Sequence, residues 1–346
     1  VKIGDNVKSN HIQNKIKKII LNQEQNDIYK KIKKQIKTNN KKVILSGVPG
    51  CGKTEVYIQV INNVLHASKQ AIVLVPEIAL IKQTFIRLNS IFGNSVGFWH
   101  SRLSKKEKKH TINQIKKNEI NVIVAARSGL FVPFDNLGII VIDEEQEYSY
   151  KQSGNSPYYN ARDVAIVRSK FSNCVLLLST ATLSLESFYN IKNKNFIYYY
   201  IKKRYNKFQM PDIHLVNMER EIYKNNIPLF SQFLLNNIKQ TLDRNEQIIL
   251  LQNRRSYSYI VKCDKCDKIN ICYRCNVSLK YHKDKNLLQC HHCDYKKKFS
   301  KYCKFCKQNS VKLYGAGTQK IEEVLNKIFT NASILRYDKD TISHKK

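Results

Sequence analysis

The stretch that decides the fold is VILSGVPGCGKTEVY, residues 43–57. Its first three residues are apolar and predict a buried strand, and the GxxxxGKT pattern that follows is typical of a P-loop. The glycines let the backbone direct successive N–H groups at one anion, and the next helix adds its positive N-terminal end. We predict that Lys53 reaches the β- and γ-phosphates of ATP and that the Thr54 hydroxyl holds Mg²⁺. The glycines of this cofactor-binding loop are Gly47, Gly50 and Gly52.

A pair of acidic residues completes the predicted nucleotide site. Residues 139–142 are apolar, as in a buried parallel strand, and Asp143 and Glu144 follow at the carboxyl end, where α/β sheets bind ligands. We predict catalytic roles for Lys53, for Asp143 as a holder of Mg²⁺, and for Glu144 as the carboxylate that polarises the attacking water. A chance glycine turn and a solvated acidic turn are the alternatives, and each is weaker because the two features occur together.

The length and charge of the chain limit its number of domains, its location and its class of partner. The chain has 346 residues, enough for two ordinary domains. It contains no run of 18 apolar residues and no signal-peptide core, so we expect a soluble, cytoplasmic chain with no membrane partner. Lys and Arg number 60 against 27 Asp and Glu, and the net charge of +33 favours a nucleic acid partner. The chain is also rich in Ile, Asn and Tyr, as an AT-rich genome would encode, so codon drift is a competing cause of the charge.

Eight of the ten cysteines form four C-x-x-C pairs. In a chain without an export signal this spacing predicts zinc rather than disulfides, and four pairs make two closed, structural Cys₄ sites. We expect the outer pairs to share one Zn²⁺ and the inner pairs the other, although the spacing also allows a sequential pairing. An iron–sulfur cluster is the second choice. The predicted metal ligands are Cys263, Cys266, Cys272, Cys275, Cys290, Cys293, Cys303 and Cys306.

Apolar runs alternate with polar helical stretches between the P-loop and the cysteines. Strands are predicted at 71–75, 122–124 and 175–178, a pattern typical of a doubly wound α/β domain. A further apolar run at 247–251 is expected to begin a second sheet. The predicted fold is two α/β lobes with a metal-binding module inserted in the second.

Several segments resemble those of one family, in the same order. They are GVPGCGKTEVY, LVPEIALIKQT, HSRLS, ARSGLFVPFDNLGIIVIDEEQEYSYKQ, YYNARDVAIVRS, LLSTATLSLES, LQNRRSY and, after the cysteine pairs, GAGTQKIEEVL. From about residue 21 to its end the chain resembles the primosomal protein N′ (PriA) family of replication-restart DNA helicases, in superfamily 2. The resemblance implies two RecA-like P-loop helicase lobes, the second incomplete, with a double zinc-binding module at 262–308.

The resemblance also implies domain boundaries. They are a short N-terminal remnant at 1–20, an ATP-binding lobe at 21–220 and the start of the second lobe at 221–346. Members of the family carry DNA-binding domains before the first lobe and an arginine finger among later motifs of the second. We therefore expect this chain to bind ATP and DNA but to unwind DNA poorly by itself.

Roles for further residues follow from the resemblance by position. Gln25, in LNQEQ, would read adenine, and the 179–182 segment would couple hydrolysis to lobe movement. Gln146 stands where the acidic box of the family usually ends in His, so the coupling between DNA binding and hydrolysis could be altered. Tyr148 belongs to an aromatic-rich loop whose rings would stack on unpaired bases. The residues expected to contact DNA are Arg127, Tyr150, Lys151, Arg254 and Arg255.

The implied function is that of an ATP-dependent DNA helicase of the primosome that translocates 3′ to 5′ on single-stranded DNA during replication restart. The expected cofactors are ATP, Mg²⁺ and two Zn²⁺. The expected partners are single-stranded and forked DNA, primosome proteins and single-stranded-DNA-binding protein. A non-catalytic, DNA-binding primosome scaffold is the alternative, and an RNA helicase is a weaker one that the family segments argue against.

Overall fold

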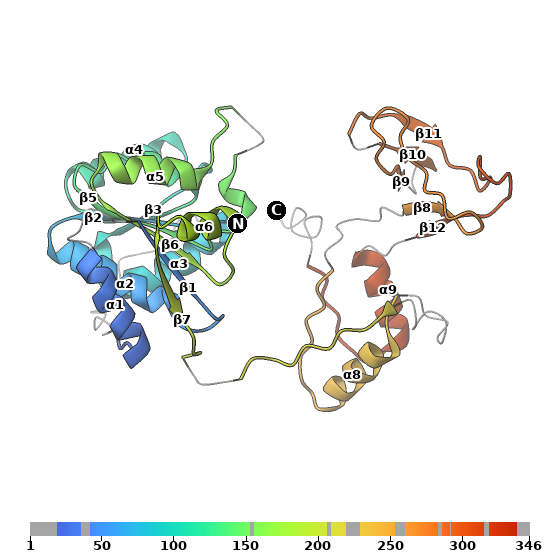
Figure 1. Ribbon diagram of the computed structural model, residues 1–346, viewed down its shortest axis with the longest axis horizontal. Helices are drawn as coiled ribbons and strands as arrows, with labels where there is room; N and C mark the ends of the chain where they lie inside the picture. Colours follow the sequence, from blue (N-terminus) through green and yellow to red (C-terminus); the bar gives the residue numbers. More distant parts are fainter. Residues whose placement is uncertain are drawn as a thin grey trace. The chain divides into compact units, whose positions relative to one another are not determined.

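The chain forms two compact units, one ending at Pro211 and the other beginning at Asp212 (Figure 1). No helix in the described part of the chain is long and apolar enough to cross a membrane. The structure, a computed structural model, describes residues 19–35, 42–152, 156–205, 209–218, 229–252, 260–282, 286–290, 292–314 and 318–337.

The first unit is built on a seven-stranded sheet with the strand order β3-β4-β2-β5-β6-β1-β7, and every neighbouring pair is parallel. Its strands are β1 (Lys42–Gly47), β2 (Gln70–Leu74), β3 (Val96–Trp99), β4 (Val122–Ala125), β5 (Leu137–Asp143), β6 (Val175–Thr180) and β7 (Ile197–Ile201). Its helices are α1 (Gln23–Gln35), α2 (Lys53–His66), α3 (Ile78–Phe92), α4 (Lys105–Lys116), α5 (Ala161–Phe171) and α6 (Leu185–Lys192). Short 3₁₀ helices are η1 (Gly93–Ser95), η2 (Arg127–Phe131) and η3 (Tyr148–Tyr150).

Alternate residues along the inner strands enter two hydrophobic cores, one on each face of the sheet. In β1, Val43 and Leu45 share a core with residues of α1, α2 and α3, whereas Ile44 shares the other core with residues of α4 and α5. Helices therefore lie on both sides of the sheet (Figure 1). Covering both faces explains why the inner strands are continuous apolar runs. The predicted doubly wound α/β fold is confirmed.

The inner strands lie where the sequence predicts them, at 43–45, 71–75, 122–124, 139–142 and 175–178, within a residue or two at their ends. The prediction missed β3 and β7, which are the two edge strands. An edge strand has a neighbour on one side alone, and residues of β7 alternate between partly buried and exposed. Neither edge strand is thus a continuous, fully buried apolar run of the kind that marks the inner strands.

In the described residues, the second unit contains the helices α8 (Gln232–Asp243) and α9 (Thr318–Ile328) and an antiparallel sheet. These helices share a small core of Phe230, Leu235, Ile238 and Leu325. The sheet has the order β11-β10-β9-β8-β12 and carries the cysteine pairs. Its strands are β8 (Ile260–Cys263), β9 (Lys280–His282), β10 (Leu287–Gln289), β11 (Lys296–Lys298) and β12 (Val311–Tyr314).

The prediction that residues 247–251 begin a second sheet is wrong for this structure, because they form no strand. Ile249 and Leu251 are 94% and 92% exposed. A strand needs neighbours that bond its backbone N–H and C=O groups, and no strand among the described residues pairs with this run. In the described residues, the second unit therefore consists of helices α8 and α9 and the cysteine-rich module.

Candidate nucleotide and metal sites

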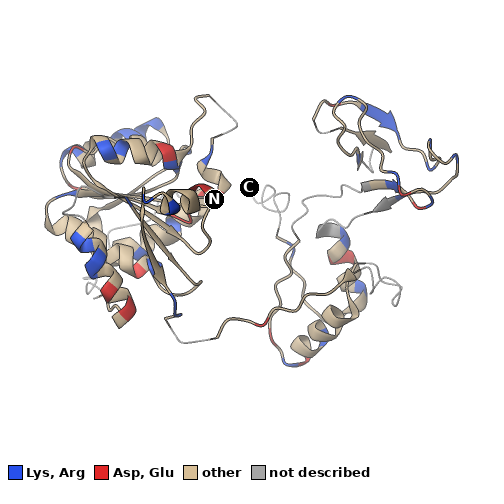
Figure 2. Cartoon of the chain, viewed as in Figure 1, with Lys and Arg blue, Asp and Glu red and all other residues tan. Residues whose placement is uncertain are grey.

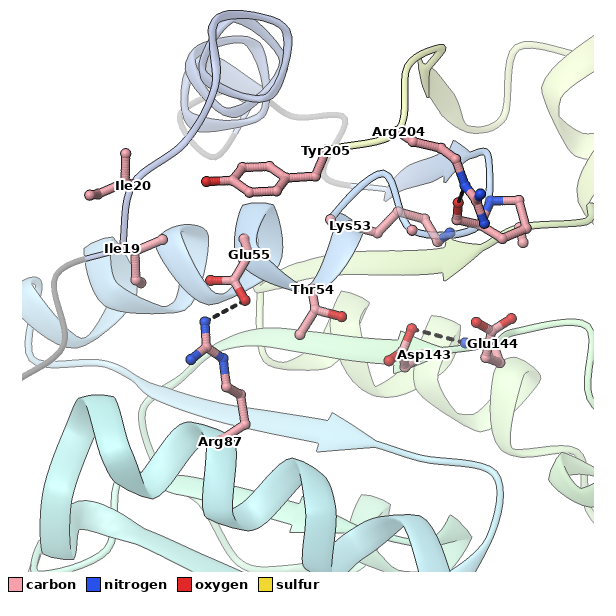
Figure 3. A pocket seen from close by; sticks show the side chains of 14 residues that line it. Ile19, Ile20, Lys53, Thr54, Glu55, Arg87, Asp143, Glu144, Arg204 and Tyr205 are labelled. Carbon is pink, nitrogen blue, oxygen red and sulfur yellow. Dashed lines mark hydrogen bonds and ion pairs between the residues drawn. The ribbon is translucent and has the colours of Figure 1, made fainter. Parts of the chain in front are cut away.

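A cavity of about 890 Å³ lies at the carboxyl ends of the strands of the first unit. Lys53 and Thr54 reach it from the start of α2, and Asp143 and Glu144 reach it from the end of β5 (Figure 3). Strands β1 and β5 are separated by β6 alone, and parallel strands bring the loops that follow them to one edge. The structure thus brings together the residues that the sequence assigns to one site, and their catalytic roles stay predictions.

Glycines shape the loop that would hold the phosphates. Gly50 and Gly52 have φ angles of +76° and +78°, which L side chains rarely adopt. A side chain at Gly47 would meet Cys51 Sγ at 2.7 Å. Helix α2 has no side-chain cap at its N-terminus, so its first backbone N–H groups are available to an anion. The Lys53 ammonium donates to Gly47 O at 3.1 Å, close to the place where it would meet phosphate oxygens.

Three donors orient the Asp143 carboxylate. Ser179 Oγ donates to Oδ1 at 2.8 Å, the Glu144 N–H donates to Oδ1 at 3.1 Å, and the Tyr57 hydroxyl donates to Oδ2 at 3.2 Å. Burial raises the pKa of Asp143 above its ordinary value, and the hydrogen bond from Ser179 partly offsets this rise. An oriented carboxylate beside the Thr54 hydroxyl is a set of hard oxygen donors that fits Mg²⁺.

The acidic box is linked to the 179–182 segment. Glu144 has a left-handed backbone, with φ of +48°, where the chain bends after β5. Gln146 Nε2 donates to Glu144 Oε2 at 2.9 Å, and Thr180 Oγ1 lies 2.6 Å from Gln146 Oε1. The Gln146 amide therefore bridges the two motifs. Unlike histidine, it does not change charge near neutral pH.

Gln25 makes different contacts from those predicted. Its side chain is fully buried, its Nε2 donates to Cys51 O at 2.8 Å, and its Oε1 accepts the Asn22 N–H at 2.9 Å. Both ends of the amide are thus bonded inside the chain, and the bidentate contact with adenine stays a prediction. In this structure, Gln25 connects α1 to the phosphate loop.

Tyr150 is a correction to the predicted DNA contacts. It is 1% exposed, and its hydroxyl lies 2.6 Å from Asp143 O and 3.1 Å from Leu74 O. A ring buried in this way cannot stack on a base, so the prediction that Tyr150 contacts DNA is wrong for this structure. Tyr148, two residues earlier, is 91% exposed and is the free ring of this loop.

The other predicted DNA contacts lie in two places. Arg127, at the start of η2, donates from Nη1 to the backbone oxygen of the exposed Lys151 at 2.9 Å, so these two basic residues are neighbours. Arg254 and Arg255 lie outside the described residues.

A buried ion pair beside the acidic box was not predicted. Glu145 is fully buried, and it accepts from Arg162 Nη1 at 2.9 Å and from the Ser184 N–H at 3.1 Å. The pair joins β5 to α5 and to the start of α6. Both charged residues lie within segments that resemble the family, but nothing in their spacing indicates that they meet. Arg204 and Tyr205, which line the nucleotide cavity, were also missed.

The eight paired cysteines form two clusters, each with all its sulfur atoms within 4.8 Å of one another. Cys263, Cys266, Cys303 and Cys306 make one cluster, and Cys272, Cys275, Cys290 and Cys293 make the other. The nested pairing that we expected is confirmed. Four thiolates at this spacing fit a tetrahedral Zn²⁺ with no open position, as in a structural site.

All four cysteine pairs have the same turn. The residue after the second cysteine has a positive φ of 56° to 61°, and its N–H donates to the carbonyl of the first cysteine at 2.9 to 3.0 Å. Ser310 Oγ lies 2.9 Å from Cys263 Sγ, and this hydrogen bond lowers the pKa of the Cys263 thiol to about 6. The residues at the turn are Asp267, Asn276, Asp294 and Lys307.

Comparison with known proteins agrees with both sites. The DEAD/DEAH box helicase family matches residues 22–191, and the PriA DNA helicase Cys-rich region domain matches residues 272–298. Replication restart protein PriA of Bacillus subtilis (strain 168) is 39% identical over 94% of this chain and 40% of its own length. The PriA of Chlamydia trachomatis is 38% identical over 93% of this chain and 43% of its own length. A structure of RecG bound to a three-way DNA junction covers 52% of this chain and 24% of the RecG chain, at 21% identity and a TM-score of 0.40.

A P-loop lobe of the DEAD/DEAH type followed by two Cys₄ zinc-binding sites defines the class of this chain as a helicase-type nucleotide-binding protein. Within that class, the chain belongs to the PriA family of replication restart helicases. It spans about two fifths of the length of these relatives.

Proposed function

We propose that this chain is the ATP-hydrolysing part of a DNA helicase that acts in replication restart and moves 3′ to 5′ on single-stranded DNA. The observation that carries the proposal is the single cavity shared by Lys53, Thr54, Asp143 and Glu144. The names of the PriA relatives support replication restart, and the direction of movement rests on the family resemblance.

The residues of the cavity suit the hydrolysis of ATP. Lys53 would exchange its bond with the Gly47 carbonyl for the β- and γ-phosphates, which the loop N–H groups also bind. Thr54 and Asp143 would hold Mg²⁺, which when bound neutralises charge on the phosphate oxygens. The Glu144 carboxylate would orient a water for attack on the γ-phosphate.

DNA is the proposed polyanion partner. The exposed Tyr148 ring lies in the same loop as Lys151, beside Arg127, so an aromatic and two basic groups are close together. Other Lys and Arg side chains are spread over several elements, including α4 and β11 (Figure 2). Phosphate contacts over a broad surface would give affinity without base specificity. Forked DNA, primosome proteins and single-stranded-DNA-binding protein are proposed as partners on the family resemblance alone.

We also propose the domain boundaries that the resemblance implies, with a first lobe at 21–220 and the start of the second at 221–346. The division into compact units between Pro211 and Asp212 supports a boundary in this region. The zinc-binding module would act as a wedge at the fork or as a docking surface for primosome proteins.

Glu144→Gln tests the proposed hydrolysis, because it keeps the shape of the side chain and removes its charge. We expect the affinity for ATP to change little and steady-state phosphate release to fall by about 10² to 10⁴-fold. Glu147→Gln, an exposed position in the same loop, is the matched control and should behave as the wild type. Wild-type turnover in Glu144→Gln would contradict the assignment.

A non-catalytic, DNA-binding scaffold is the second candidate, and one observation favours it. The segments 247–251 and 333–337 form no strand in the described part of the chain. Leu335 and Tyr337 are 90% and 81% exposed. DNA binding without ATP turnover in the wild-type chain would support this candidate.

A further inference from the structure

One wall of the nucleotide cavity comes from a segment that belongs to none of the motifs described above. After β7 ends at Ile201, residues 202–205 cross the phosphate loop, and we call these four residues the strap. Arg204 and Tyr205 of the strap line the cavity together with the P-loop (Figure 3).

The strap is fixed to α1 at its first half. The Glu24 carboxylate accepts the backbone N–H of Lys202 at 2.8 Å and that of Lys203 at 3.3 Å. Glu24 is the neighbour of Gln25, which bonds to the phosphate loop through Cys51 O at 2.8 Å. Helix α1 therefore holds the strap and the phosphate loop at the same time.

The second half of the strap is bonded to the phosphate loop itself. Arg204 Nε donates to Pro49 O at 2.9 Å, and the Tyr205 N–H donates to Gly50 O at 3.0 Å. With four hydrogen bonds from successive residues, the backbone of the strap has a defined place beside the phosphates. The direction in which the Tyr205 side chain leaves the strap is thereby defined as well.

Across the cavity from the strap lie two apolar side chains that precede α1. Ile19 is partly buried against the core of the lobe, which fixes its position, while Ile20 is 72% exposed. Tyr205 is 51% exposed, and in Figure 3 its ring extends from the strap toward Ile20, with Ile19 and Glu55 also on this side. These side chains give one end of a polar cavity an apolar surface.

We propose that Tyr205 and the pair Ile19 and Ile20 bind the base of the nucleotide, with the Tyr205 ring stacked on it. The inference rests on the proposed nucleotide function, since Lys53 and the loop glycines hold the phosphates at the other end of the cavity. The Gln25 amide is already bonded inside the chain, so stacking and apolar contact supply the affinity for the base. A purine, with its larger ring, gains more from such contacts than a pyrimidine.

A comparison of two ligands, one with a base and one without, separates the contribution of the base to affinity from that of the phosphates. Calorimetric titrations with Mg-ADP and with Mg-pyrophosphate are compared for the wild type, Tyr205→Ala, Tyr205→Phe and Lys53→Ala. We expect Tyr205→Ala to weaken ADP about tenfold or more and to leave pyrophosphate within about twofold, because pyrophosphate has no base. Tyr205→Phe should bind ADP like the wild type, and Tyr198→Ala, a partly exposed tyrosine on β7 outside the cavity, should change neither ligand.

Other outcomes overturn the proposal and identify the error. If Tyr205→Ala binds ADP like the wild type, the ring does not contact the base. If it loses ADP and pyrophosphate equally, Tyr205 acts on the phosphate loop instead. If the wild type binds neither ligand and Lys53→Ala does not differ from it, the proposed nucleotide function fails, and this inference fails with it.

Discussion

At the scale of single residues, the proposed chemistry depends on the charge of Asp143. Burial raises its pKa, and the hydrogen bonds from Ser179 and Tyr57 lower it. The carboxylate must be ionised to hold Mg²⁺. ATP hydrolysis should therefore decline on acidification, as this carboxylate becomes protonated.

The fall in activity at low pH is the acid limb of the pH profile. Removing a hydroxyl donor to Asp143 should move this limb to higher pH, because the ionised carboxylate loses a stabilising hydrogen bond. We expect a larger shift for Ser179→Ala than for Tyr57→Phe, since the Ser179 bond is 2.8 Å long and the Tyr57 bond 3.2 Å. The measurement is the pH profile of kcat for both variants, with Ser169→Ala, a buried serine of α5, as the control. Acid limbs that coincide with that of the wild type would show that Asp143 is not the group that titrates.

The stability of the folded chain, measured as a function of pH, distinguishes the titration of Asp143 from acid unfolding. The pKa of Asp143 is raised in the folded chain, so between its unfolded and folded pKa values the folded state binds more protons. In that window this residue adds stability as the pH falls, while activity is lost. Unfolding that accompanies the loss of activity would point to other groups.

A sequence motif predicts the place of a side chain well where the neighbouring residues in the sequence alone determine it. The P-loop glycines and Lys53 follow one strand directly, and their placement needs little else. Tyr150 was predicted wrongly because a tyrosine suits both a contact with a ligand and a buried hydrogen bond. Contacts with distant parts of the chain decide between these outcomes, and a local sequence pattern does not show such contacts.

At the scale of elements, the module of β8 to β12 depends on its cysteines. Apart from cysteine, its buried core contains Val261, Leu279, Leu288 and Val311. So few apolar residues give little free energy of folding, whereas structural zinc contributes on the order of 10 kcal/mol. The metal should therefore decide whether this module folds.

Metal analysis of the purified chain should find two zinc ions, and a strong chelator should unfold residues 260–314 while the first unit keeps its structure. Cys266→Ser should lower the zinc content toward one, because it removes a ligand from one cluster. Cys174→Ala is the control, since Cys174 lies outside both clusters and should leave the content at two. Much less than two zinc in the wild type, or a module that stays folded without metal, would contradict the account.

The sequence predicted a strand correctly where other strands of the chain lie beside it and complete the sheet. Residues 139–142 and 247–251 are similar apolar runs, yet the first is a central strand and the second forms no strand. The difference lies in the available partners, because β5 has β2 and β6 beside it. Periodicity indicates what a segment can form, and the other segments decide whether it does.

At the scale of the whole molecule, the sequence predicts a P-loop lobe followed by a zinc-binding module, and the structure and the relatives agree. The strap could not be predicted, since its role depends on the bonds that residues 202–205 make with α1 and the phosphate loop, far away in the sequence. The net charge of +33 likewise does not locate DNA, because basic residues occur on both units.

The central claim is that the cavity of the first unit is a working, DNA-responsive ATPase site. Steady-state phosphate release from ATP, measured with and without single-stranded DNA, tests it most directly, with Lys53→Ala as the control. We expect turnover that DNA stimulates and that Lys53→Ala abolishes. Absence of turnover in a wild-type chain that still binds DNA, or equal turnover in Lys53→Ala, would contradict it.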